Sequence, residues 1–379
     1  MFEYQQHGKF FAQVAGSMED LGALELKEFG AKEITPVYRG VHFKTDISHI
    51  YRINFQSKFI SRILAPLITF DCHSTKYLYS TASNIEWDKL LNNNKTFAIY
   101  SNVSNSKITH SRYATLVLKD AIADYFTKKY NARPDINTDS PDVVFNLFIH
   151  KNRATISLDT SGDPLHKRGY RQSKGSAPMQ ETLAAAIVKL SGWNGKMPLY
   201  DPMCGSGTLL CEALMNYCRI PSGFKRKRFG FENLPEFDES EWKKIKENST
   251  KHIRELPKKF IFGSDMSYFA IEDSKLNFIM LPSAENIDLK QTDFMSLPEI
   301  HDATIICNPP YGIRLGTKES TTELYKNLGD FLKQKCKGCT AYIYVGDKEL
   351  IPAIGLKPSF KRPLKNGNLD GRLLKIEIY

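Results

Sequence analysis

Residues 199–208, "LYDPMCGSGT", predict the first strand, turn and helix of a ligand-binding sheet. The apolar run ends at Asp201, and the turn that follows carries Gly205 and Gly207 before Thr208 opens a stretch of helical pattern. Glycine adopts backbone dihedrals that other residues avoid and lets a ligand come close to the main chain, while Thr208 can cap the helix. We therefore expect a site at the carboxyl end of this strand, where open parallel sheets bind ligands.

The residues around this motif alternate between strand and helix patterns, which predicts a doubly wound, mostly parallel α/β sheet. Strands are expected at 197–201, 259–265, 286–293, 303–310 and 340–347, and helices at 179–193, 207–218, 268–280 and 323–335. The last stretch, 359–379, carries Asn366-Gly367 and Asp370-Gly371 between extended runs, which predicts a hairpin. A parallel sheet closed by an antiparallel hairpin is typical of S-adenosylmethionine-dependent methyltransferases.

The glycine turn does not fit the two common phosphate-binding patterns. A P-loop needs Lys and then Ser or Thr after its last glycine, and a pyrophosphate fingerprint needs a glycine where Leu210 stands. Asp201 instead offers a carboxylate to a cationic group such as the methionine ammonium of S-adenosylmethionine. Asp265 ends the next strand, where an acidic side chain can accept both ribose hydroxyls. Asp293, with Phe294, is expected to hold the adenine, and a loop-capping aspartate is the alternative.

The distance along the chain from Asp201 to Asp265 is 64 residues, against about 20 in a simple βαβ unit. Residues from about 219 to 258 are therefore expected to be an insertion. It contains the basic and aromatic stretch "FKRKRFGF" at 224–231, which we expect to line the substrate entrance.

The strand at 303–310 ends in Asn308-Pro309-Pro310-Tyr311. Proline cannot donate to a sheet ladder, so a stiff loop must follow at the carboxyl end of the strand. The Asn308 carboxamide oxygen and the Pro309 carbonyl can accept the two hydrogens of a nucleobase amine and orient its nitrogen toward a methyl donor. Tyr311 offers a stacking face for a base taken out of its helix. These residues are the candidate catalytic group.

The first 160 residues have a different pattern, in which short strand-like runs alternate with helical ones. The strand-like runs are at 9–16, 41–46, 95–103, 142–150 and 154–160, and helical patterns occupy 18–30 and 112–130. Strands and helices paired at this scale suggest ferredoxin-like α+β units.

A basic surplus raises the odds of a nucleic-acid partner. The chain carries 52 Lys and Arg against 42 Asp and Glu, a formal net charge of +10, and such an excess attracts phosphate backbones if it gathers on one face. Two runs mix cations with aromatic rings, as a surface that follows a nucleic-acid strand would. The RNA-binding candidates from these runs are Lys167, Arg168, Tyr170, Arg171, Lys225, Arg226, Lys227 and Arg228.

Length and composition suggest two or three domains in 379 residues. The seven cysteines are odd in number and scattered, which suits reduced thiols in a core. Cys336 and Cys339 form the only CxxC, a weak zinc signal, so we expect no metal. We find no apolar stretch of about 18 residues and no secretory signal, and we expect a soluble, cytoplasmic protein with no membrane contact.

The whole chain resembles the THUMP-domain RNA methyltransferases that make N2-methylguanosine, especially the bacterial 23S rRNA guanine-N2 methyltransferases. The matching stretches are "GDPLHKRGYR" at 162–171, "APMQETLAAAIVKLSGW" at 177–193, "LYDPMCGSGTLLCEA" at 199–213, "CNPPYGIRL" at 307–315 and "NGNLDGRLL" at 366–374. One departure is the "IPSG" step at 220–223, where relatives usually show Pro-Gly.

The resemblance implies a ferredoxin-like domain at 1–62, a THUMP domain at 63–162 that grips structured RNA, and a class I methyltransferase domain at 163–379 with the insertion at about 219–258. It also implies that S-adenosyl-L-methionine is the cofactor. The cofactor-binding residues carried over are Asp201, Pro202, Met203, Cys204, Gly205, Ser206, Gly207, Asp265, Met266, Asp293 and Phe294, with Pro178, Glu181 and Thr182 at the start of the helix that closes over the cofactor.

Several functions stay open at this point. The leading hypothesis is an RNA guanine-N2 methyltransferase acting on 23S rRNA, or alternatively on tRNA. A DNA adenine-N6 methyltransferase is a second, because "NPPY" also serves adenine and cytosine amines. A non-catalytic RNA-binding factor is a third, against which Asp201, Asn308 and Tyr311 argue. The expected partner is structured RNA, with no obligate protein partner evident.

Overall fold

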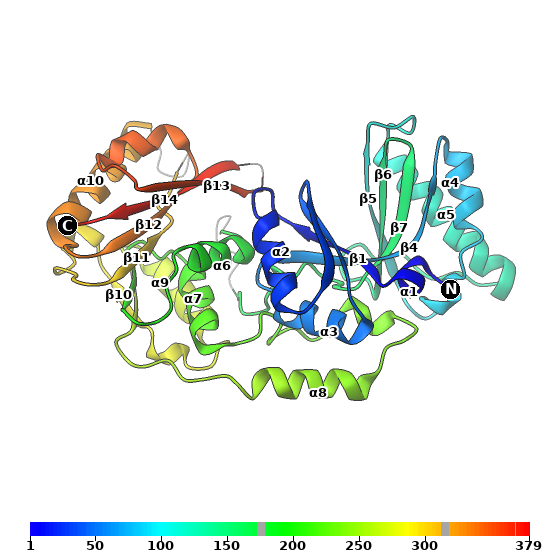
Figure 1. Ribbon diagram of the computed structural model, residues 1–379, viewed down its shortest axis with the longest axis horizontal. Coiled ribbons are helices and arrows are strands. Elements are labelled where there is room, and N and C mark those ends of the chain that lie inside the picture. Colours follow the sequence, from blue (N-terminus) through cyan, green and yellow to red (C-terminus); the bar gives the residue numbers. More distant parts are fainter. Residues whose placement is uncertain (173–178, 312–317, 368) are drawn as a thin grey trace. The chain divides into compact units, whose positions relative to one another are not determined.

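The computed structural model describes residues 1–172, 179–311, 318–367 and 369–379 (Figure 1). The chain forms two compact units. The N-terminal unit comprises residues 1–14, 22–165 and 226–246, and the C-terminal unit comprises residues 15–21, 166–225 and 247–379. Each unit is built around a seven-stranded sheet.

The sheet of the N-terminal unit has the strand order β2-β3-β1-β4-β7-β6-β5. Neighbouring strands are antiparallel except β5 and β6, which are parallel. The strands are β1 (Lys9–Val14), β2 (Lys32–Val37), β3 (Gly40–Lys44), β4 (Ile60–Asp71), β5 (Phe97–Ser104), β6 (Val143–His150) and β7 (Arg153–Asp159). The helices of the N-terminal segments are α1 (Glu3–His7), α2 (Glu19–Glu28), α3 (Ile47–Gln56), α4 (Thr75–Ala82) and α5 (Ser111–Tyr130).

Strand β4 joins the two predicted N-terminal domains into one sheet. Its first residues pair with β1, up to Leu64, and the residues from Leu64 onward pair with β7. The predicted boundary at 62/63 therefore falls inside a strand. The strand-like runs expected from the sequence do not include β4. The β4–β7 register shifts between Pro66 and Ile68, where a bulge accommodates the missing N–H.

The predicted insertion lies between α7 (Thr208–Cys218) and β9 (Ile261–Asp265), and it includes α8 (Glu239–Thr250). Its middle part, residues 226–246, packs in the N-terminal unit. Phe229, Phe231 and Trp242 enter the core of that unit, where the ring of Phe231 stacks on Tyr51 at 4.7 Å between centroids.

Two arginines of the insertion hold this segment down. The Arg226 guanidinium donates to the carbonyl oxygens of Ser161, Asp163 and Pro164, each at 2.9 Å. Arg228 forms an ion pair of 3.0 Å with Asp142. The interpretation of Arg226 as a free RNA contact is therefore corrected, because both its terminal nitrogens donate to main-chain carbonyls within the protein. Arg228 is exposed and stays a predicted RNA contact.

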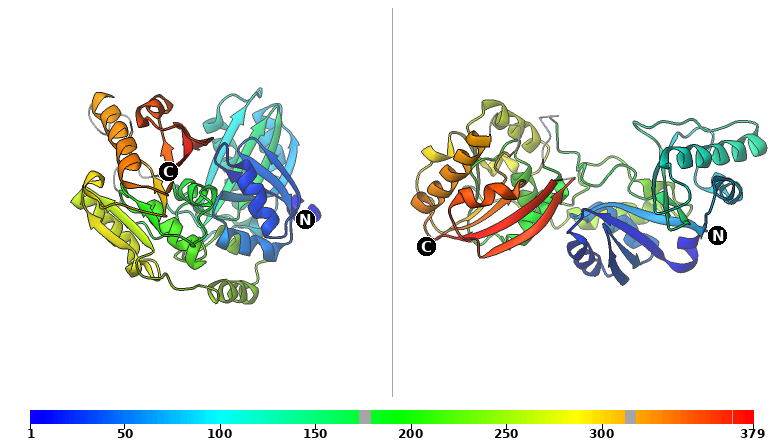
Figure 2. Two further views of the ribbon diagram at one scale, coloured as in Figure 1. Left: turned by 60° about the vertical axis from the view of Figure 1, so that its left-hand side comes forward. Right: turned by 90° about the horizontal axis from the view of Figure 1, so that it is seen from above.

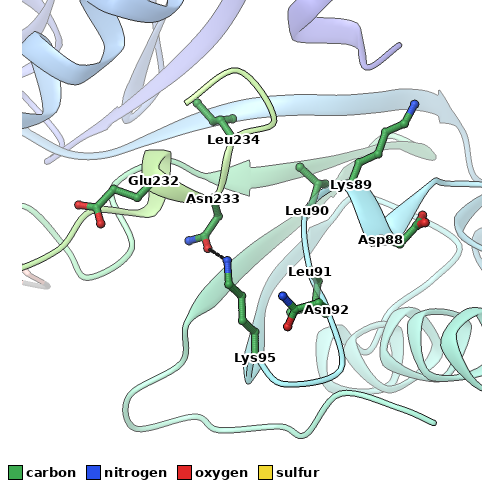
Figure 3. Close-up of a pocket in the computed structure, with 9 residues that line it drawn as sticks. All are labelled: Asp88, Lys89, Leu90, Leu91, Asn92, Lys95, Glu232, Asn233 and Leu234. Atoms are coloured by element: carbon green, nitrogen blue, oxygen red, sulfur yellow. Dashed lines mark hydrogen bonds between the residues drawn. The ribbon is translucent and has the colours of Figure 1, made fainter. Parts of the chain in front are cut away.

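A pocket of about 230 Å³ lies where the insertion meets the segment 88–95 (Figure 3). The Lys95 amine donates to the Asn233 carboxamide at 2.8 Å. Asp88 accepts hydrogen bonds from Lys129 and Tyr130. Because these polar groups are already paired within the protein, we interpret the pocket as a gap left where the insertion packs on the segment 88–95, and we do not interpret it as a ligand site.

The sheet of the C-terminal unit has the order β10-β9-β8-β11-β12-β14-β13. The strands are β8 (Leu199–Asp201), β9, β10 (Asp288–Gln291), β11 (Thr304–Cys307), β12 (Thr340–Val345), β13 (Phe360–Asn366) and β14 (Leu369–Glu377). The first five are parallel, and β14 inserts antiparallel between β12 and β13. The helices are α6 (Glu181–Leu190), α7, α9 (Tyr268–Phe278) and α10 (Lys318–Lys335).

The central strands of this sheet are covered on both faces (Figure 2). The residues from Ala341 to Val345 in β12 and from Ile305 to Cys307 in β11 are all buried, which is typical of parallel strands between helical layers. The predicted doubly wound α/β sheet with a terminal antiparallel hairpin is thus confirmed.

The seven cysteines are all buried and free. No helix in the described ranges is sufficiently long and apolar for a bilayer crossing.

We expect Arg226→Ala to lower the free energy of unfolding by about 2 kcal/mol, because three carbonyl oxygens lose a charged donor. Lys227→Ala is the matched control, since Lys227 is exposed and surface substitutions usually change stability by less than about 0.5 kcal/mol. Urea denaturation of the full chain measures both. Equal stability of the two variants would contradict the anchoring role.

Candidate functional site

The candidate site lies at the carboxyl ends of β8, β9 and β11. Strand β8 pairs with β9 on one side and with β11 on the other, so the chain reverses its direction across the sheet at β8. Open α/β sheets bind ligands at such a switch point. The thiol of Cys307, at the end of β11, lies near Asp201 and Asp265, and burial together with these two carboxylates raises its pKa well above the ordinary value.

The turn after β8 contains two glycines, Gly205 and Gly207, whose missing side chains serve different purposes. Both have positive φ, +55° at Gly205 and +74° at Gly207, a conformation that costs other L-residues about 1–2 kcal/mol. A Cβ on Gly207 would lie 2.8 Å from a ring carbon of Phe278, so the turn packs directly on α9. A Cβ on Gly205 would meet no atom of the described residues within 4 Å, which leaves space for a ligand against the main chain.

The turn is braced from β9 and α9. Asp265 accepts the Gly205 N–H at 2.9 Å with one carboxylate oxygen and the Ser267 N–H at 2.9 Å with the other. Ser274 donates to the Gly205 carbonyl at 2.8 Å, and the Asn277 amide donates to the Ser206 carbonyl at 2.9 Å. Ser274 and Asn277 were not predicted as site residues, because their only signal in the sequence is that they are polar residues within a predicted helix.

Asp201 lies beneath this turn and is 1% exposed. Its Oδ1 accepts the Met203 N–H at 3.2 Å. Burial raises the pKa of the Asp201 carboxyl well above its usual range, and the charge of Asp265 raises it further. A cation placed beside this carboxyl would stabilise its charged form and lower its pKa.

The end of β10 only partly matches the prediction. Asp293 is exposed and caps the short helix at Phe294–Ser296 by accepting the Met295 N–H at 2.9 Å. The ring of Phe294 is buried and packs edge-on against Phe331 at 5.5 Å. The expectation that Phe294 offers its flat face to an adenine is therefore wrong, because the hydrophobic core already contains that ring.

The "NPPY" residues follow β11 directly. The Asn308 Oδ1 atom is buried, and it accepts no hydrogen bond from any residue that the structure describes. The Tyr311 ring lies on Gly346, where an added Cβ would come within 2.5–2.6 Å of three ring carbons. The Asn366 amide donates to the Tyr311 hydroxyl at 3.4 Å. Gly346 and Asn366, neither of them predicted, thus set the position of the ring.

Three residues predicted to bind RNA have internal roles instead. Arg168 is 2% exposed and pairs with Glu212, whose carboxyl also accepts a hydrogen bond from the buried Tyr170 hydroxyl. Because neither side chain reaches the surface, Arg168 and Tyr170 are removed from the set of RNA contacts.

Arg171 is the third corrected residue. It donates to Glu181 at 2.9 Å, to the Thr208 hydroxyl at 3.1 Å and to the Met179 carbonyl at 3.3 Å. It thereby ties the start of α6 to the start of α7. From the sequence, Arg171 was predicted to lie on the surface, because the sequence does not show that the buried Glu181 pairs with it.

The remaining predicted residues are distributed as follows. Lys167, Lys225, Lys227 and Met266 are exposed, and Pro202, Cys204, Glu181 and Thr182 are buried. Met203, Ser206 and Pro310 are half-buried, and Pro309 is buried. Pro178 lies outside the described residues. The described residues include no cluster of three or more His, Cys, Asp or Glu that could hold a metal ion.

Chemically, this edge of the sheet combines an open main-chain cradle, acidic side chains and a buried acceptor, Asn308 Oδ1, for which the described residues supply no donor. The space at Gly205 and the carboxylates of Asp201 and Asp265 fit a ligand with a cationic group and a ribose. The Asn308 oxygen fits an amine hydrogen.

Family comparison agrees with this architecture. Residues 168–375 match the RMKL-like methyltransferase domain, residues 72–159 match the THUMP domain, and residues 9–64 match the RlmL ferredoxin-like domain.

Individual proteins are similar over nearly the whole chain. A Synechocystis sp. protein with the provisional name RNA methyltransferase slr0064 is 37% identical, covering 98% of this chain and 97% of the relative. The ribosomal RNA large subunit methyltransferase K/L of Photobacterium profundum is 38% identical over 96% of this chain, which spans about half (52%) of that relative's length. The crystal structure of SMU.472 with SAH superposes with a TM-score of 0.86 at 26% identity, covering 98% of both chains.

On its domain content and on these identities, the chain belongs to the family of RMKL-like methyltransferases with ferredoxin-like and THUMP domains.

Proposed function

We propose that the chain transfers a methyl group from S-adenosyl-L-methionine to the exocyclic N2 of a guanosine in structured RNA, with 23S rRNA as the favoured substrate. The observation that carries the proposal is the buried Asn308 Oδ1, which lacks a donor among the described residues at the carboxyl end of β11. A buried acceptor without a donor costs about 1–3 kcal/mol. An amine hydrogen of a substrate base removes that cost.

The cofactor part of the proposal rests on the cradle around the glycine turn. The open side of Gly205 admits the methionine end of the cofactor, and the Asp201 carboxylate faces its ammonium. Asp265 keeps lone pairs for the ribose hydroxyls, because each carboxylate oxygen accepts one main-chain N–H and has room for a second donor. The similar SMU.472 structure was solved with SAH.

The proposed roles of the base-binding residues are supported by the unpartnered Asn308 oxygen and by the position of the Tyr311 ring. When bound, S-adenosylmethionine supplies an electrophilic methyl group. Asn308 Oδ1 and the Pro309 carbonyl accept the two amine hydrogens, which turns the nitrogen lone pair toward that methyl group and stabilises the positive charge that develops on nitrogen. Since Gly346 supports one face of the Tyr311 ring, the other face is the one that stacks on the base.

RNA is favoured over DNA because of the N-terminal unit and the relatives. The unit contains the THUMP match, and two similar proteins are named as RNA or ribosomal RNA methyltransferases. Guanosine N2 is the amine that the overall resemblance implies.

The direct test is methyl transfer from radiolabelled S-adenosylmethionine to total rRNA, tRNA and DNA from a strain that lacks the protein. We expect label in large-subunit rRNA, recovered as N2-methylguanosine after nuclease digestion. Label found in DNA alone, as N6-methyladenine, would contradict the proposal.

Asn308→Ala should lower kcat by about 10²–10³-fold, the typical cost of one preorganised polar contact to a transition state. The dissociation constant for S-adenosylmethionine, measured by calorimetry, should stay within about threefold, because Asn308 is assigned to the base. Asn308→Asp keeps an acceptor oxygen of similar size and should retain more activity. Full activity of Asn308→Ala would remove the proposed role.

Affinity for S-adenosylmethionine should rise with pH through the raised pKa of Asp201 and then level off. The ammonium lowers the pKa of this carboxyl in the complex, so binding releases a proton and is favoured by deprotonation of the free protein. Asp201→Asn should bind more weakly and lose this dependence. Calorimetry in matched buffers measures the affinity of the wild-type protein and of Asp201→Asn against pH. If both affinities change with pH in the same way, Asp201 does not face the ammonium.

A further inference from the structure

Three loops meet at one end of the N-terminal sheet. They are residues 71–76 after β4, residues 104–113 between the end of β5 and the first turn of α5, and the β6–β7 turn at 150–153 (Figure 1). Hydrogen bonds join them: the Cys72 N–H donates to the Asn152 carbonyl at 2.6 Å, and the Lys107 N–H donates to the Asn152 side chain at 2.8 Å. We call these three segments the loop end.

The loop end carries a concentrated positive charge. It contains a single acidic residue, Asp71, against five exposed cations, which are Lys76, Lys107, Arg112, Lys151 and Arg153. None of the five forms an ion pair with a described residue. Some cations elsewhere in this unit do, as in Lys44 with Glu33 and Lys89 with Glu86. The formal charge of +4, with His neutral, therefore stays uncompensated within the described part of the unit.

Three exposed aromatic rings lie within these segments or within two residues of them along the chain. Tyr77 and Tyr113, in the first turns of α4 and α5, are 60% and 56% exposed, and Phe148 on β6 is 45% exposed. Phe148 belongs to the face of the sheet opposite its buried neighbours Leu147 and Ile149. Its ring stacks at 14° on the His150 ring, with 6.2 Å between centroids.

We propose that the loop end, with Phe148, binds a single-stranded segment of the substrate RNA. The five cations neutralise phosphates, and the three rings stack on unpaired bases. The charge selects a polyanion, and the rings select unpaired bases, because a base inside a duplex has no free face for stacking. This inference rests on the proposed RNA methyltransferase function and adds the place and kind of contact.

This surface differs from the basic runs that sequence reasoning chose. Its charges come from three segments separated by 30 to 40 residues, so they form no run in the sequence. The pairing of β4, β5, β6 and β7 brings these segments together.

The test compares Lys107→Glu/Lys151→Glu/Arg153→Glu with a matched control, Lys9→Glu/Lys27→Glu/Lys32→Glu, which reverses three exposed lysines in the ferredoxin-like part. The probe is a fluorescein-labelled, unstructured 20-nucleotide RNA, followed by anisotropy between 50 and 200 mM salt. The loop-end variant should bind at least about 30-fold more weakly, and its slope of log K against log salt should fall by about 2, from three lost contacts at ~0.7 each. The control should stay within about threefold.

Phe148→Ala should weaken binding of the same RNA by about tenfold without changing the salt slope, because stacking releases no counterions. Two controls test whether the variants are folded: their affinity for S-adenosylmethionine, measured by calorimetry, and their thermal unfolding midpoint. Both should equal the wild-type values.

Wild-type affinity in both the loop-end variant and Phe148→Ala would overturn the proposal. Equal losses on a fully paired hairpin RNA would overturn the single-stranded assignment. If the wild-type chain methylates no RNA but the loop-end variant still loses RNA binding, the surface stands and the proposed function fails. If the wild-type chain methylates RNA and the variant keeps its KM for RNA, the surface fails and the function stands.

Discussion

The buried carboxamide oxygen of Asn308 is the constraint on which the functional account depends. It sits where β11 ends, and two prolines prevent the chain from continuing the ladder that would have satisfied nearby polar groups. Neighbouring elements fix its surroundings: β8 holds β11 in register, the Tyr311 ring rests on Gly346, and Asp265 ties the glycine turn to β9. Because no described residue donates to this oxygen, our proposal assigns it to a ligand that supplies the hydrogen.

The sheet of the C-terminal unit could be predicted from sequence because its signals are local. Local sequence patterns predict three of its parts directly: the glycines predict the turn after β8, the helical period predicts α7, and the paired turn residues predict the hairpin that ends in β14. The strand tips at Asp201, Asp265 and Asn308 follow directly, since every parallel strand ends at the same edge. Asp293 also follows, and there the structure shows the plain capping contact that the sequence had left as an alternative.

The partners of the charged residues could not be predicted, because they depend on contacts between distant segments. Arg168, Arg171 and Arg226 look like surface cations until Glu212, Glu181 and the carbonyls of residues 161–164 appear opposite them. Phe294 looks free until α10 brings Phe331 against it. The shared strand β4 was not predicted, and its pairing with both β1 and β7 likewise depends on contacts between distant segments. The loop end illustrates the opposite case. Its cations are isolated in the sequence and form one charged surface only when the strands pair.

The most direct measurement is a crystal structure of the protein with S-adenosylhomocysteine and an RNA fragment that contains the methylated guanosine. The account predicts that the base is turned out of its stack against Tyr311, with its N2 atom about 2.7–3.2 Å from Asn308 Oδ1. A complex in which that oxygen accepts a hydrogen bond from another protein group, while the base amine is held elsewhere, would contradict it.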